Sequence, residues 1–346
     1  MPRGIIYHSI RQDLKMLIKA MFKPLNNVKI IGQFEDGFAS YLDCRHCIAF
    51  PYARIAIYYS LKLQNFPANS ELIMPPITIK AILDVVLDLG LKPIFIDIDP
   101  ETLCFDLAQL KASVTPNTKA ILITYLYGMV PNVESLVSLS KQNNLFILED
   151  FSQCLNGEYK GKKVGGFGDV GIFSSSSIKT LDTYGGGLLV TNNDVLSQKL
   201  REHQNSLAPA SRRDLIKKIY TNIVRNVATS RLIFHVFVFP LLRIIQYFTP
   251  DTWIKNTGDR NKNPINKLPE SWFCQYTSVQ ATLGLELLPA INASDAIRIK
   301  NSNYIRANTS IQFPKGTAHT KNVFWQTIAY FSEPRGVLNF LSKKKN

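Results

Sequence analysis

The stretch FILEDFSQCLNGEYKGKKVGGFGDVGIFSSSSIKTLDTYGGGLLVT, residues 146–191, decides the fold of this chain. An apolar run at 145–148 predicts a buried strand that ends at Glu149 and Asp150. A second apolar run at 170–173 opens into four serines and then Lys179. Three glycines follow before the chain returns to an apolar run, so the stretch predicts three strands with polar residues at two of their ends.

Ligands usually bind where the strands of an α/β sheet end, and the polar residues of this stretch match one kind of ligand. A pyridoxal phosphate site needs a lysine for covalent attachment, a carboxylate for the pyridine nitrogen, hydroxyls for the phosphate and a donor near the ring oxygen. Lys179, Asp150, Ser174 and Gln153 have these chemistries in that order. Each residue alone also fits an ordinary role. Lys179 could be an exposed lysine and Asp150 a helix N-cap. Ser174 could belong to a polar turn and Gln153 to a helix surface.

Outside this stretch, apolar runs alternate with helical segments from Glu71 onward. We expect strands at 72–74, 93–98 and 119–125, and helices at 53–63, 77–89, 133–143 and 278–288. Asp97 and Asp99 are expected at the end of the strand at 93–98. This alternation predicts an α/β fold with a mostly parallel sheet and helices on both faces.

Composition indicates a globular protein. The chain has 346 residues, of which 46% are hydrophobic and 19% charged. Five cysteines, together with an N-terminal segment that lacks the apolar core of a secretory signal, lead us to expect the reducing cytoplasm. Cys44 and Cys47 form a lone CxxC, for which packed thiols are favoured over zinc or redox use, and no metal is expected.

The net charge of +14 is concentrated in one region. Residues 199–267 hold thirteen Lys and Arg against four Asp and Glu. A nucleic-acid-binding protein would join such charge to a known recognition module, and none is found, so nucleic acid is not an expected partner.

The run at 232–248 is apolar but interrupted by His235, Pro240 and Arg243, which makes it short and broken for a membrane span. Two alternatives stay open: helices packed on the body or across a dimer, and an interfacial helix in peripheral contact with the inner membrane surface. The N-terminal segment 1–25 predicts a helix packed on the main domain or on a partner subunit. Lys343 to Lys345 are expected to form a solvated tail.

The central stretch resembles the DegT-type sugar aminotransferases, which are pyridoxal phosphate enzymes of fold type I. The resemblance rests on Glu149-Asp150, Gln153, the Gly-Phe-Gly-Asp at 166–169, Phe173-Ser174, Lys179 and Gly186-Gly187. It extends over about 40–205 and 275–310.

By this resemblance Lys179 would bind the cofactor covalently and Asp150 would face the pyridine nitrogen. Gln153 would lie near the ring oxygen, and Ser174 would bind the phosphate. The implied reaction transfers an amino group, from glutamate, to a nucleotide-linked keto sugar in surface polysaccharide or related sugar biosynthesis. Members of the family are homodimers with the site at the subunit interface.

The chain departs from the family pattern at several positions. Tyr52-Ala53-Arg54 stands where Ser-Gly-Thr is usual, and we expect Ala53 and Arg54 to contact the phosphate, Arg54 through its guanidinium. Ile79 takes the place of an aromatic that stacks on the ring. Phe273 or Cys274 takes the place of an asparagine that the partner subunit donates.

The resemblance also implies a domain division. Residues 1–290 would form the large cofactor-binding domain, with the basic and hydrophobic insert at 206–269. Residues 291–346 would form a small C-terminal α+β domain that is shorter than in the family. The alternative to a working aminotransferase is therefore an inactive or truncated relative that binds pyridoxal phosphate or another ligand and dimerises.

Overall fold

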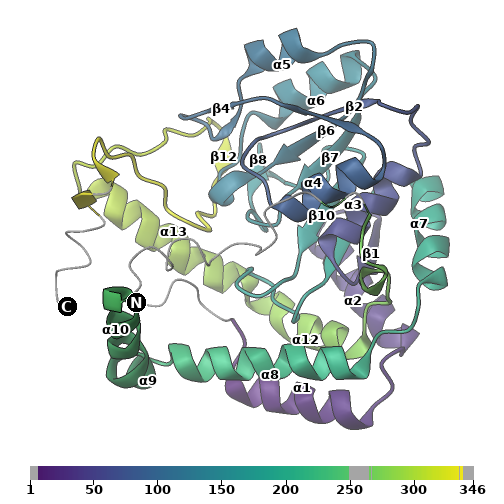
Figure 1. The fold of residues 1–346 in the computed structure, drawn as a ribbon. Coiled ribbons are helices and arrows are strands. Elements are labelled where there is room, and N and C mark those ends of the chain that lie inside the picture. The colour runs from purple at the N-terminus through teal and green to yellow at the C-terminus, as the bar shows by residue number, and fades with distance from the viewer. Residues whose placement is uncertain (1–6, 249–264, 266, 335, 338–346) are drawn as a thin grey trace.

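A seven-stranded sheet forms the centre of the molecule (Figure 1). The computed structural model describes residues 7–248, 265, 267–334 and 336–337. The strand order is β1 (His46–Phe50), β11 (Gly187–Thr191), β10 (Val170–Ser174), β7 (Phe146–Asp150), β6 (Thr118–Thr124), β2 (Glu71–Met74) and β3 (Lys92–Phe95). The strands from β10 to β3 run parallel, and β11 is antiparallel to both of its neighbours. The predicted mostly parallel α/β sheet is confirmed.

Consecutive side chains along the strands enter two separate cores. Ile147 belongs to one buried cluster and Leu148 to the other, and the same alternation holds for Leu188 and Leu189. Because successive side chains point to opposite faces and both faces are covered, these strands are apolar throughout. The helices of the α/β body are α2 (Val28–Leu42), α3 (Ala53–Lys62), α4 (Lys80–Asp88), α5 (Leu107–Ser113), α6 (Val133–Gln142), α7 (Asp194–Ser206) and α12 (Ser278–Leu287).

Two expected elements were wrong in their extent. The strand predicted at 93–98 ends at Phe95, since the Asp97 carboxylate accepts from the Ile98 amide at 2.8 Å and turns the chain. Residues beyond it form a separate pair, β4 (Ile98–Asp99) with β5 (Cys104–Phe105). The helix predicted from 77 begins only at Lys80, because Pro75 and Pro76 precede a turn and Ile79 is the N-cap.

The helix predicted within segment 1–25 is α1 (Ile10–Phe22), which packs antiparallel to α8 (Arg212–Thr229). Residues 1–6 of that segment lie outside the described residues. At one end the Arg212 guanidinium donates to the carbonyl oxygens of Ala20 and Lys23. At the other end the Asn226 side chain donates to the Asp13 carboxylate at 2.7 Å. Helix α1 is thus fixed to the insert as well as to the body.

Beyond α8 the insert continues as α9 (Arg231–Ile233), a π-helical turn η2 (Phe234–Val238) and α10 (Phe239–Phe248). Within the described ranges, no single helix has the length and apolar character that a membrane crossing needs. One pair, α8 with residues 231–245, has both but is bent by 65°.

The C-terminal region is joined to the loop that follows β7. Helix α13 (Ile291–Ala307) leads to β12 (Thr320–Lys321), which pairs with β8 (Glu158–Tyr159). Strand β8 pairs in turn with β9 (Lys162–Lys163). The domain division at 290 stays a prediction, and the predicted tail at Lys343–Lys345 lies outside the described residues.

Candidate active site

The carboxyl ends of three neighbouring strands meet at one edge of the sheet. Asp150 at the end of β7 is in register with Thr124 on β6 and with Ile172 on β10. The chain after β6, the turn after β7 and the serine loop after β10 therefore leave the sheet side by side. This arrangement brings Asp150, Gln153, Ser174 and the loop of Lys179 to the same edge.

Lys179 lies in a strained loop and is partly buried. Its amide donates to the Ser176 carbonyl at 3.1 Å, and the preceding Ile178 has φ +72°. A β-branched residue rarely adopts this left-handed conformation, and such strain is often found at functional sites. Burial lowers the pKa of Lys179 below its ordinary value, while the negative charge of Asp150 acts in the opposite direction.

Trp325 covers this lysine, a role that no sequence pattern predicts. The Lys179 ammonium lies 4.3 Å from the centroid of the indole ring. The indole nitrogen donates to the Ile178 carbonyl at 3.2 Å. On the other side, Gly128 (φ +82°) lies so close that a Cβ there would be 2.5 Å from the Trp325 amide nitrogen. The C-terminal segment is therefore packed over the strand ends.

Ser152 joins the ends of β7 and β10 and was also missed. Its amide donates to the Asp150 carboxylate at 3.0 Å, and its hydroxyl accepts from the Ser174 amide at 2.9 Å. The chain after Asp150 forms turns, so the alternative role of Asp150 as a helix N-cap is wrong.

Gln153 and Ser174 each have one fixed partner. The Gln153 side-chain oxygen accepts from the Tyr127 amide at 2.7 Å, which leaves its NH₂ group as the end that can donate to a ligand. The Ser174 hydroxyl donates to the Ser176 hydroxyl at 3.2 Å. The hydroxyl cluster is therefore a connected group at the end of β10.

Glu149 has no predicted role, yet it organises the loop that carries the Gly-Phe-Gly-Asp motif. Its buried carboxylate accepts from the amides of Gly165, Phe167 and Gly168 at 2.9, 2.7 and 2.6 Å. The Tyr125 hydroxyl donates to it at 2.5 Å. The glutamate next to Asp150 thus holds the loop under the site.

Ala53 and Arg54 begin α3, close to Gly187 at the start of β11. A Cβ at Gly187 would lie 2.4 Å from the backbone of Ala53, so only glycine permits this approach. The Arg54 guanidinium lies 3.6 Å from the Trp272 ring centroid and 4.4 Å from that of Tyr52. Its predicted contact with a phosphate stays a prediction, as does that of Ala53.

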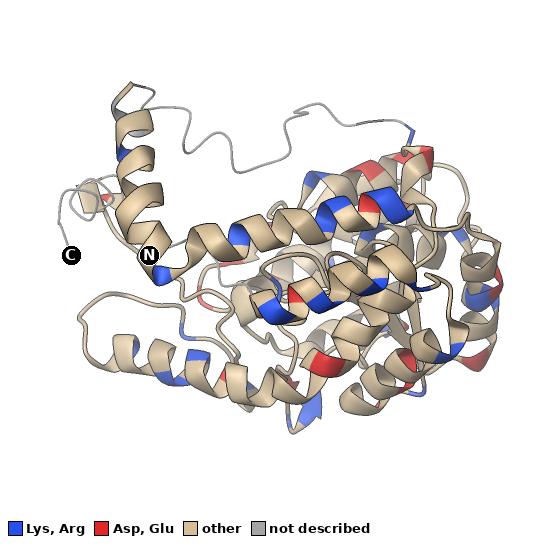
Figure 2. Ribbon diagram, turned by 90° about the horizontal axis from the view of Figure 1, so that it is seen from below, with Lys and Arg blue, Asp and Glu red and all other residues tan. Residues whose placement is uncertain are grey.

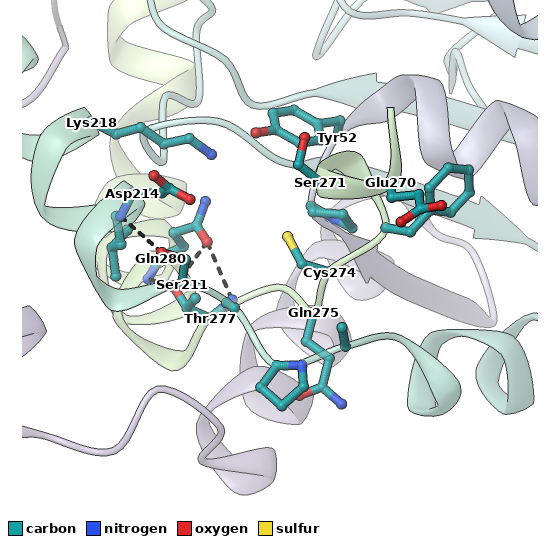
Figure 3. A pocket seen from close by; sticks show the side chains of 16 residues that line it. Tyr52, Ser211, Asp214, Lys218, Glu270, Ser271, Cys274, Gln275, Thr277 and Gln280 are labelled. Carbon is teal, nitrogen blue, oxygen red and sulfur yellow. Dashed lines mark hydrogen bonds between the residues drawn. The ribbon is translucent and has the colours of Figure 1, made fainter. Parts of the chain in front are cut away.

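A pocket of about 240 Å³ opens beside Tyr52 (Figure 3). The Lys218 ammonium lies 4.6 Å from the Tyr52 ring centroid, and Phe273 and Cys274 form part of the wall. The six predicted site residues do not line this pocket, although it adjoins the start of α3. Ile79, predicted to face the ring, is largely exposed at the N-cap of α4.

The CxxC cysteines carry protonated thiols. Burial raises the pKa of Cys44 to about 11 and that of Cys47 well above its ordinary value. Across the described ranges no group of three His, Cys, Asp or Glu side chains is placed to hold a metal ion.

Comparison with known proteins identifies the family. Residues 12–221, more than half of the chain, match the DegT/DnrJ/EryC1/StrS aminotransferase family. The chain belongs to this family. The family resemblance seen in the sequence is therefore confirmed.

Similar proteins agree with this assignment. GDP-perosamine synthase of Caulobacter vibrioides is 34% identical over 173 residues, which are 50% of this chain and 47% of that protein. Spore coat polysaccharide biosynthesis protein SpsC of Bacillus subtilis is 32% identical over 171 residues, 49% of this chain and 44% of that protein. The chain spans about half the length of the curated relatives it matches.

A solved structure extends the similarity of the fold beyond this matched part. The crystal structure of a DegT DnrJ EryC1 StrS aminotransferase from Brucella abortus has a TM-score of 0.71 at 19% identity. The alignment covers 96% of this chain and 78% of that one.

Proposed function

We propose that this DegT family protein is a pyridoxal phosphate-dependent sugar aminotransferase. The observation that carries the proposal is the environment of Lys179, a partly buried lysine of lowered pKa that is influenced by Asp150 at the end of a neighbouring strand. A lysine that is easily deprotonated and a nearby carboxylate are the pair that this cofactor requires.

The residues present fit the cofactor in their chemistry. Lys179 would attach it, and Asp150, held by the Ser152 amide, would pair with the ring nitrogen. The NH₂ group of Gln153 can donate to the ring oxygen, since the amide oxygen already accepts from Tyr127. Ser174 would contribute its hydroxyl to the phosphate, with Ala53 and Arg54 as the further phosphate contacts that we expect.

The pyridoxal phosphate, when bound, supplies an electron sink that stabilises the carbanion formed at the substrate. The residues of the chain would provide proton transfer and exclude water. Lys179 would accept and return a proton through its amine, whose neutral form is favoured by burial. Asp150 would hold a proton on the ring nitrogen. Trp325 covers the Lys179 amine and limits the access of water.

The substrates that we propose follow from the relatives. Two of them are named for GDP-perosamine synthesis and for spore coat polysaccharide biosynthesis, and both names support a sugar acceptor. We infer a nucleotide-linked keto sugar as acceptor, glutamate as donor, and a cytoplasmic homodimer as the working form. Light scattering of the purified chain would give the mass of the assembly directly.

Absorbance spectroscopy with pyridoxal phosphate tests the proposal. The native chain should develop the visible band of a lysine-bound cofactor, and glutamate should convert it to the band of the aminated cofactor. Lys179→Ala should remove the first band, whereas Lys141→Ala, an exposed lysine on α6, should leave it intact. When a panel of nucleotide-linked keto sugars is then added one at a time, the true acceptor should restore the original band.

The same experiment distinguishes a working aminotransferase from an inactive relative. A native band that glutamate does not convert would identify an inactive family member that binds the cofactor without turnover. Absence of any band in the folded native chain would contradict the proposal altogether.

A further inference from the structure

The paired helices α1 and α8 expose apolar side chains on the outer side of the molecule. Both helices use the opposite side for packing, with Met16 and Ala20 of α1 and Leu215 and Ile219 of α8 buried. The exposed apolar residues are Ile10, Leu14, Ile18, Met21 and Phe22 on α1 and Tyr220, Val224 and Val227 on α8. Ile18 is 60% exposed and Phe22 73%, so these side chains contribute little to the core.

The exposed residues form one stripe on each helix. On α1 they recur at positions 10, 14, 18 and 21, and on α8 at 220, 224 and 227, which is the spacing of one helix face. Helices α1 and α8 lie side by side (Figure 2), so the two stripes run along adjoining helices. After a bend of 65°, α8 is followed by α9, η2 and α10, in which Phe237 of η2 and Leu241 and Ile244 of α10 are also more than half exposed.

The charges on these two helices are mostly basic, although Glu286 of α12 pairs with Lys15 at 2.5 Å. Residues 10–29 hold five Lys and Arg against one acidic residue, Asp13, which is buried. Residues 206–248 hold seven Lys and Arg against Asp214 alone. Figure 2 shows the basic residues distributed along both helices. Apolar stripes flanked by cations are typical of helices that lie in the interface of an anionic bilayer.

We propose that the face made by α1, α8 and η2–α10 docks on an anionic lipid surface. The basic charge of this face favours a lipid surface over a second copy of the chain as its partner. A symmetric dimer through the same face would bring the cations of one copy against those of the other, whereas anionic headgroups complement them. The apolar stripes would enter the boundary between headgroups and acyl chains.

This docking would also bring the candidate site near the membrane. The Asn222 side chain, on the buried side of α8, accepts from the Ser177 hydroxyl at 3.1 Å. A single helix thus separates the proposed lipid face from the serine loop that leads to Lys179.

Flotation of the full chain with vesicles tests the proposal. The chain should float with phosphatidylcholine vesicles that contain phosphatidylglycerol and remain unbound with phosphatidylcholine alone. Salt of about 1 M, where the Debye length is about 3 Å, should reduce the binding strongly. Arg213→Gln with Lys217→Gln should lower the partition coefficient by on the order of tenfold, since each cation contributes to the attraction.

The apolar part is tested by Leu14→Gln with Ile18→Gln, and separately by Val224→Gln with Val227→Gln. Each pair should lower the partition coefficient by about tenfold or more. The matched control is Val195→Gln on α7, where the valine is 65% exposed but belongs to neither stripe. Thermal unfolding by circular dichroism confirms that each variant folds.

Three results would overturn the proposal. The first is that the folded native chain does not float with anionic vesicles. The second is that it floats equally well with neutral vesicles. The third is that the stripe variants bind vesicles as strongly as the native chain. If light scattering shows instead that the stripe variants convert a lipid-indifferent dimer into a monomer, the face is an interface between two copies.

Discussion

The Trp325 indole lies over the Lys179 ammonium, with 4.3 Å between the nitrogen and the ring centroid, and donates to the carbonyl of Ile178. Two residues far apart in the sequence thus form one wall of the candidate site. The contact excludes water from one side of the lysine, and burial lowers the pKa of its amine. The C-terminal segment therefore takes part in setting the chemistry of the strand ends.

The charge of Asp150 should control the pKa of Lys179. Burial lowers this pKa and the Asp150 carboxylate raises it, so Asp150→Asn should lower it further. The pH dependence of Lys179 acylation, followed by mass spectrometry of the chain without added cofactor, measures the change. Asp36→Asn, at an exposed position on α2, should have no effect. An unchanged or raised pKa in Asp150→Asn would contradict the electrostatic link.

Glu149→Gln should destabilise the fold by about 2–3 kcal/mol, because a buried acceptor of four hydrogen bonds would gain an NH₂ group that faces other donors. Urea unfolding gives the free energy. Glu202→Gln, an exposed position on α7, should change it by less than about 0.5 kcal/mol. Equal stability of the two variants would show that the carboxylate is not needed to hold the loop.

The free energy of unfolding should fall at alkaline pH, where the buried His8 loses its proton. Burial opposes its charge, but hydrogen bonds and charge interactions with Asp13 and Asp182 raise its pKa to about 9. A raised pKa means that the stabilisation is complete below the unfolded value of about 6.5 and is lost as pH rises through about 9. The loss is on the order of 3 kcal/mol.

The free energy of unfolding of the native chain and of His8→Gln, measured from about pH 6 to pH 10, tests this dependence. The two curves should converge as the pH rises, while His235→Gln, at an exposed position, should follow the native curve. A constant difference between His8→Gln and the native chain would contradict the assigned ionisation.

Gly187→Ala should destabilise the chain by about 1–3 kcal/mol, because the added Cβ would overlap the backbone of Ala53 at 2.4 Å. Gly32→Ala is the matched control, since a Cβ there meets open space within α2 and should stabilise by about 0.5–1 kcal/mol. Thermal unfolding distinguishes the two. Stabilisation by Gly187→Ala would show that α3 and β11 can move apart freely.

Local patterns predicted the sheet well. The apolar runs around Leu148 and Ile172 marked buried strands correctly, because strands covered on both faces need apolar residues at every position. The end of the strand at 93–98 was wrong because the Asp97 side chain competes with the ladder for a backbone amide, a choice that apolar content does not reveal.

The candidate site was predicted only where its residues follow strands. Asp150, Gln153, Ser174 and Lys179 are close in sequence to strand ends and could be found there. The parts played by Trp325, Ser152 and Glu149 depend on contacts across the fold, such as the bond from the Ser174 amide to the Ser152 hydroxyl. No local spacing encodes such contacts. The aromatic pair Phe324-Trp325, within the segment predicted to form the small C-terminal domain, was the available signal.

The assignment of the site is tested most sharply by identifying the lysine that binds pyridoxal phosphate. The full chain is incubated with the cofactor, the bond is made permanent with borohydride, and the labelled peptide is found by mass spectrometry. We predict a single label on Lys179, and loss of that label in Lys179→Arg. A label on other lysines that persists in Lys179→Arg, or no label at all in the folded chain, would contradict the assignment of the site.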